Sequence, residues 1–145
     1  METPTKAAEK IKAYVDRVDS NVQEMLQEFS TFLNKSKAKY QEEIQQIKTS
    51  AVHAQEEVKK GYEQRLQHLK TGYEKLTISG RSLMETKFVP LRAKVTQLKE
   101  NVAETSHRTE EKWEKFRHET EKLLETTKLA FSNFKETFKH ESNQG

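Results

Sequence analysis

Apolar positions along the chain repeat with a period of 22 residues. One copy runs from Tyr40 to Val58, the next from Tyr62 to Gly80, and a third from Met84 to Val102. Each copy averages about 3.67 residues per apolar step, which is the hendecad period. Because an α-helix makes about 3.6 residues per turn, this period places the apolar side chains in a nearly straight line along one helix face, here called the apolar stripe. The pattern predicts long amphipathic helices with 11- and 22-residue repeats.

The apolar stripe continues beyond these copies in both directions. Upstream, the apolar residues of segment 18–32 hold the same places in the repeat. Downstream, the stripe resumes one residue out of phase in segment 113–138, which is rich in aromatic residues. We therefore expect one helical domain, residues 1–145, with a repeat region at 18–105 and an aromatic C-terminal helix at 113–138.

Few positions should interrupt these helices. A helix is expected to begin near Thr3, which can cap its N-terminus, with Pro4 in its first position. The segment TISGRS, from Thr77 to Ser82, joins β-branched residues to a glycine and is predicted to form a turn. Pro90 should kink the helix or begin a new one. A second turn is predicted in the polar stretch from Thr105 to Lys112.

Two segments are nearly the same in sequence. YQEEIQQIKTS begins at Tyr40, and YEQRLQHLKTG begins 22 residues later at Tyr62. Amphipathicity alone would require apolar residues at these places but would not select the same tyrosine and the same ending. Duplication of a helical unit accounts for the likeness most economically.

The composition supports long helices with polar outer faces. Charged residues make up 34% of the chain and hydrophobic residues 32%, with four glycines and two prolines. No segment shows the alternation of a β-strand. We expect an all-α fold in which long amphipathic helices pack as an elongated bundle or as a hairpin.

The charge balance narrows the classes of partner. The chain has 26 basic and 23 acidic residues, a net charge of +3, and the two signs alternate along the sequence. Nucleic acid is therefore not an expected partner. No apolar run is long enough for a signal peptide or a membrane span. These features predict a cytoplasmic or lipid-surface-associated protein, or a secreted one if residue 1 follows a processing site.

No constellation of residues predicts catalysis. The five histidines lack the i, i+3 or i, i+4 partners that a zinc site on a helix would use. Adjacent glutamates such as Glu42 and Glu43 point about 100° apart on a helix, so they do not form a two-carboxylate site. A glycine-rich phosphate loop is missing and cysteine is absent. We predict neither an enzyme, nor a metal site, nor a cofactor.

The apolar stripe is the remaining candidate for function. At about 100° per residue the stripe residues from Tyr62 to Leu76 fall within an arc of roughly 80°, and Arg65 and Lys70 flank that arc on either side. Basic rims suit lipid binding, because their methylene groups can lie beside lipid while the charges reach headgroups. The candidate lipid-binding residues are Tyr62, Leu66, Leu69, Tyr73, Leu76, Phe88, Leu91, Val95, Leu98, Val102, Trp113, Phe116, Phe131, Phe134 and Phe138.

A helix seam explains the same stripe without lipid. In a bundle or coiled coil the rim charges make ion pairs between helices, and a narrow apolar arc is typical of such a seam. The aromatic C-terminal segment favours lipid instead, because Trp and Phe are good interfacial anchors. The alternative to lipid binding is therefore a coiled-coil structural or interaction protein, a homo-oligomer that self-associates through the stripe.

The repeats resemble those of the exchangeable apolipoproteins, the A-I, A-IV and E group. The segment KFVPLRAKVTQLKENVAE, from Lys87 to Glu104, is similar to the repeats of that family that begin at a proline, and LAFSNFKETF is similar to its aromatic lipid-binding ends. Perilipin-like droplet coats and desiccation proteins share the same period. The resemblance implies lipid binding or transport, with a lipid, membrane or droplet surface as the partner.

Overall fold

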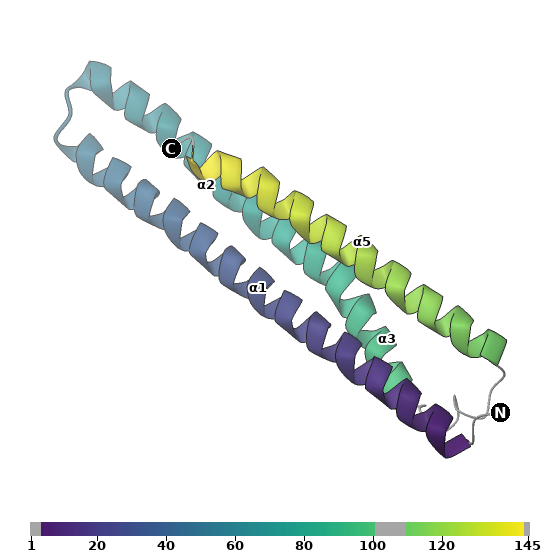
Figure 1. Ribbon diagram of the computed structural model, residues 1–145. Helices are drawn as coiled ribbons and strands as arrows, with labels where there is room; N and C mark the ends of the chain where they lie inside the picture. The colour runs from purple at the N-terminus through teal and green to yellow at the C-terminus, as the bar shows by residue number, and fades with distance from the viewer. Residues whose placement is uncertain (1–3, 101–109, 144–145) are drawn as a thin grey trace. The chain divides into compact units, whose positions relative to one another are not determined.

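The computed structural model describes residues 4–100 and 110–143 of the chain (Figure 1). In these ranges the chain is helical except for a short turn at residues 53–55, and it contains no strand. The predicted all-α fold of long helices is confirmed. The helices in chain order are α1 (Pro4–Val52), α2 (Glu56–Leu83), the π-helix η1 (Met84–Phe88), α3 (Val89–Glu100) and α5 (Glu110–Asn143).

The turn between α1 and α2 lies at residues 53–55, which the sequence did not reveal. The backbone N–H of Ala54 donates to the carbonyl of Ala51 at 3.3 Å and closes the end of α1. The carbonyl of Gln55 accepts from the N–H of Val58 at 3.0 Å and from that of Lys59 at 2.9 Å, which begins α2. Two acidic residues, Glu56 and Glu57, occupy the first turn of α2, where the helix dipole favours negative charge.

The turn predicted from Thr77 to Ser82 is wrong, because α2 continues through this segment to Leu83. Gly80 has a packing role there. A Cβ at position 80 would lie only 3.0 Å from Cδ1 of Leu33 on α1. The glycine therefore permits a close approach of two helices and does not break one. Ile78 points outward and is exposed, so its branched side chain is compatible with the helix.

The boundary expected at Pro90 is confirmed as a change of helix type. The backbone N–H of Val89 bonds to the carbonyl of Met84, five residues back, which is the pattern of a π-helix. Proline has no N–H, and its ring collides with the carbonyl four residues earlier in a regular α-helix. The wider turn of η1 directly before Pro90 relieves this conflict. The predicted turn from Thr105 to Lys112 falls mostly outside the described residues, which resume at Glu110 as α5.

The helices pack as two units. Unit 1 takes α1 up to Glu28 together with the chain from Leu83 to Phe131. Unit 2 takes the chain from Phe29 to Ser82 together with α5 from Ser132. The buried apolar side chains of unit 1 are those of Ile11, Tyr14, Val15, Val18, Val22, Met25, Leu83, Phe88, Leu91, Val95, Leu98, Leu124 and Phe131.

Unit 2 contains an α1–α2 hairpin and the last part of α5 (Figure 1). The buried apolar side chains of unit 2 are those of Phe29, Tyr40, Leu69, Leu76, Phe134 and Phe138. The Phe134 ring lies 5.6 Å from that of Phe29, 5.7 Å from that of Phe32 and 4.9 Å from that of Phe138 between centroids. Aromatic packing of this kind adds about 0.5–1.5 kcal/mol per pair beyond area burial. A cluster of phenylalanines therefore holds α5 in this unit.

Candidate lipid-binding surface

The stripe residues of η1 and α3 form the centre of unit 1. Phe88, Leu91, Val95 and Leu98 are all buried, and Phe88 is 0% exposed. The ring of Phe88 meets that of Phe131 on α5 edge-on, with centroids 6.2 Å apart. Helical spacing therefore predicted correctly which residues share a face. In this structure that face contacts other helices of the same chain.

The basic rim beside this stripe makes ion pairs inside unit 1. Lys94 Nζ lies 3.2 Å from a carboxylate oxygen of Glu119 on α5, and 4.7 Å from the ring centroid of Phe116. Lys99 Nζ lies 2.6 Å from a carboxylate oxygen of Asp19 on α1. Such partly exposed pairs contribute about 0–1 kcal/mol each, so they orient the helices more than they stabilise them.

Trp113 and Phe116 lie in the first part of α5, and both are half-buried. The ring of Trp113 packs edge-on against Tyr14 of α1, with centroids 5.5 Å apart. The hydroxyl of Tyr14 donates to the backbone carbonyl of Arg117 at 3.4 Å. The start of the aromatic segment is thus attached to α1 by a ring contact and by a hydrogen bond.

The phenol of Tyr14 has a strongly shifted pKa. Burial, followed by the negative charge of Glu121, raises the pKa of Tyr14 from 10.0 to about 12, against a smaller lowering by Arg117 and Arg17. A side-chain hydrogen bond with Glu121 is a third raising cause, and all three disfavour the phenolate. Tyr14 is therefore held as a neutral phenol over the whole physiological range of pH.

Two threonines complete the buried face of α5, and the sequence analysis missed them. Thr120 and Thr127 are 0% and 1% exposed. Their hydroxyls donate to carbonyls of their own helix, that of Thr120 to Phe116 at 2.9 Å and that of Thr127 to Leu123 at 2.7 Å. Both lie in helical phase with the aromatic residues, four positions after Phe116 and four before Phe131. The period could have identified them, whereas a search restricted to apolar residue types could not.

All three phenylalanines near the end of α5 are buried, one of them in unit 1 and the other two in unit 2. Phe131 belongs to unit 1, whereas Phe134 and Phe138 belong to unit 2. Their spacing of three and seven residues predicted a shared helix face, and all three side chains are covered. Val102, the remaining candidate in the repeat region, lies outside the described residues.

The α1–α2 hairpin of unit 2 buries its stripe only in part. Leu69 and Leu76 are buried, but Tyr62, Leu66 and Tyr73 are half-buried. Between residues 41 and 68 no side chain is fully buried. At the turn, two valines lie open to solvent, Val52 at 71% exposed and Val58 at 51% exposed. The hairpin end of unit 2 therefore combines exposed valines with a half-buried apolar stripe.

The described residues contain neither a metal-binding cluster nor a membrane-spanning helix. Among the side chains that the structure describes, those of residues 9–100 and 113–139, there is no group of three or more His, Asp or Glu placed to hold a metal ion. In the same part of the chain, none of the helices has both the length and the apolarity needed to cross a membrane.

Comparison with known proteins returned no match, whether to a protein-family model, to a curated protein or to a solved structure.

Proposed function

We propose that this chain binds lipid surfaces reversibly, in the manner of the exchangeable apolipoproteins, by opening its helical units. The observation that carries the proposal is that the buried core of each unit is the apolar stripe itself. On opening, the stripe exchanges helical partners for acyl chains, and the polar faces stay in water. Both states cover the same apolar side chains, so their free energies can be close enough for reversible exchange.

The hydrogen bonding of the units supports low-cost opening. Backbone hydrogen bonds of an α-helix stay within that helix, so they persist when helices separate. The buried hydroxyls of Thr120 and Thr127 also bond inside α5 and keep these partners on a lipid surface. Separation of the helices therefore exposes mainly apolar surface, which acyl chains can cover.

The basic rim supports the same proposal. Lys94 and Lys99 hold partly exposed ion pairs whose loss costs about 1 kcal/mol or less each. After opening, their ammonium groups can reach anionic headgroups while their methylene groups lie along the acyl boundary.

Self-association is the second candidate function. The observation that favours it is the half-buried seam of the α1–α2 hairpin at residues 41–68, which a second helical hairpin could cover. Unit 1 contributes less to this candidate, because its stripe residues on α3 are already buried within the unit.

Flotation with vesicles, paired with sedimentation of the lipid-free chain, separates the two candidates. We expect a monomer without lipid that floats with vesicles and transfers to a second vesicle population added later. Leu129→Ser should float as the wild-type chain does, because Leu129 is exposed and lies outside the stripe. A chain that never floats and forms oligomers as its concentration rises would reject lipid binding in favour of self-association.

A further inference from the structure

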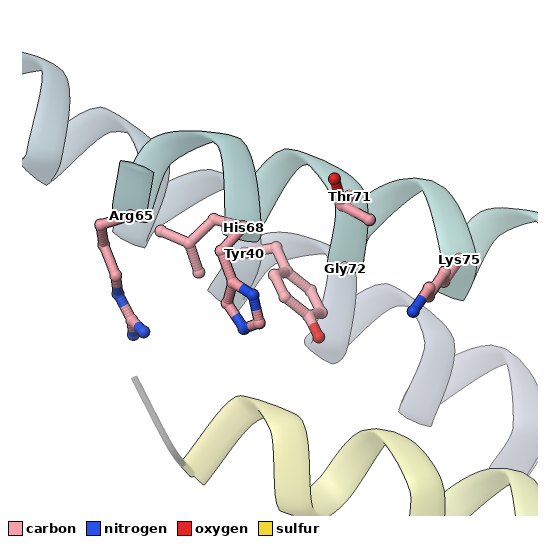
Figure 2. Close-up of a pocket in the computed structure, with 7 residues that line it drawn as sticks. Tyr40, Arg65, His68, Thr71, Gly72 and Lys75 are labelled. Atoms are coloured by element: carbon pink, nitrogen blue, oxygen red, sulfur yellow. The ribbon is translucent and has the colours of Figure 1, made fainter. Parts of the chain in front are cut away.

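A shallow basic hollow lies on the α1–α2 hairpin of unit 2 (Figure 2). The space at this site measures about 380 Å³, which includes open solvent. Figure 2 shows the side chains of Arg65, His68 and Lys75 extending from α2 toward the same side, with the ring of Tyr40 between the last two. The hollow is lined by Tyr40, Arg65, His68, Leu69, Thr71, Gly72 and Lys75.

The groups that line the basic hollow suit an anion. None of the seven lining residues is acidic, whereas Arg65 and Lys75 each carry a positive charge. The guanidinium can donate two parallel N–H bonds to a phosphate, and the ammonium adds a compact charge. The imidazole of His68 can donate a further hydrogen bond.

The spacing of these groups fits a surface better than a single small ion. Arg65, His68 and Lys75 fall within an arc of about 80° on α2, since an α-helix turns about 100° per residue. Arg65 and Lys75 are ten residues apart, which is about 15 Å along a helix. A row of that length can meet the phosphates of neighbouring lipid molecules at once.

The basic hollow also lies where the apolar core of unit 2 ends. Tyr40 on α1 and Leu69 on α2 are the fully buried side chains nearest to the turn at residues 53–55. The apolar seam between them and that turn is half-buried. A headgroup held by Arg65 would therefore place Leu66 and Tyr62 beside the acyl boundary. Electrostatic contact and entry of the apolar seam into lipid can then occur at one place.

We propose that the basic hollow binds the phosphate groups of anionic lipid headgroups and makes the α1–α2 hairpin the first part of the chain to dock. This inference rests on the proposed lipid binding and adds a lipid class and a site of first contact. Arg65 and Lys75 supply the charge, and His68 supplies a further hydrogen bond.

The test compares two variants that each lose two positive charges from α2. Arg65→Gln/Lys75→Gln removes the charges of the basic hollow. Lys60→Gln/Arg81→Gln is the matched control, because both side chains are exposed and neither lines the hollow. Each variant is assayed with vesicles of phosphatidylcholine alone and with vesicles that also contain phosphatidylglycerol. Thermal melting checks that both variants stay folded.

On phosphatidylglycerol vesicles we expect the hollow variant to lose about tenfold or more in affinity, as two basic groups at an anionic surface imply. The control variant should lose much less, and on phosphatidylcholine alone all three proteins should bind alike. Equal losses in both variants, or no loss in either, would overturn the headgroup site while leaving lipid binding intact. If the wild-type chain bound neither kind of vesicle, the proposed function would fail as well.

Inorganic phosphate separates a lipid surface from a free anion as the source of the phosphate group. We expect millimolar phosphate to displace the wild-type chain from phosphatidylglycerol vesicles no better than sulfate at the same ionic strength. Displacement specific to phosphate would show a site for a small free anion and would contradict the proposed headgroup site.

Discussion

Tyr40 packs directly on Gly72 across the α1–α2 hairpin, with its Cε1 2.9 Å from the point that a Cβ of residue 72 would occupy. Tyr40 is the first residue of one of the two nearly identical segments, and Gly72 is the last residue of the other. The duplicated segments therefore lie antiparallel in unit 2. The glycine that ends one copy makes room for the tyrosine that begins the other.

Gly72→Ala should destabilise the chain by about 1–2 kcal/mol. Alanine favours a helix by up to about 1 kcal/mol over glycine, but here its methyl group would overlap a buried ring that has little room to move. Chemical denaturation monitored by circular dichroism measures the change.

Gly61→Ala is the matched control on the same helix. A Cβ at position 61 would meet nothing within 4 Å, so this substitution should stabilise the chain by up to about 1 kcal/mol. Stabilisation of equal size by both substitutions would show that Tyr40 does not pack on Gly72.

Tyr14 should make the stability of unit 1 fall at high pH. Its pKa is raised to about 12 in the fold against 10.0 in an unfolded chain. Between these values the folded state keeps a proton that the unfolded state has lost, so stability is complete below pH 10 and declines as the pH rises toward 12.

The comparison with Tyr14→Phe isolates this contribution, because lysines and other tyrosines titrate in the same range in both proteins. Denaturant midpoints measured from pH 9 to pH 12 should converge as the pH rises, with wild type losing its advantage over the variant. A constant difference between the two proteins across that range would contradict a raised pKa for Tyr14.

Phe88→Leu should accelerate vesicle binding while it destabilises the lipid-free chain. The smaller side chain leaves a gap beside Phe131 in a fully buried place and costs about 1 kcal/mol. If binding requires opening, a loss of that size raises the open population about fivefold. Stopped-flow mixing with vesicles should show a rate increase of that order.

Leu129→Val provides the control for this rate, because it trims a side chain that is exposed on the outer face of α5. Neither its stability nor its association rate should change appreciably. An unaltered rate in Phe88→Leu, despite a measured loss of stability, would mean that the chain binds vesicles without opening unit 1.

The fold could be predicted from sequence as far as fold class and helix faces are concerned. The hendecad period identified residues such as Leu91 and Val95 as one buried face, and Pro90 marked a boundary between helices. The turns were harder to predict. Gly80 was interpreted as a breaker but serves close packing against Leu33, whereas the actual turn at residues 53–55 contains neither glycine nor proline.

The candidate site could be predicted only in part, because an apolar face has the same sequence whether helices or acyl chains cover it. The period placed Phe88 and Phe131 correctly on helix faces but could not indicate that their rings meet. Thr120 and Thr127 escaped notice because only apolar residue types were assigned to the stripe, and threonine becomes compatible with burial once a local carbonyl accepts its hydroxyl. The basic hollow depends on the antiparallel packing of Tyr40 beside α2, a long-range contact.

The central claim is that the side chains of the closed core are those that contact lipid. Its most direct test moves the single tryptophan of the chain into the core, as Phe88→Trp in a Trp113→Phe background. Because Phe88 is 0% exposed, lipid cannot touch this position while unit 1 is closed. We expect vesicles with brominated acyl chains to quench the fluorescence strongly, and unbrominated vesicles of the same composition not to. Full binding to the brominated vesicles with no quenching would contradict the account.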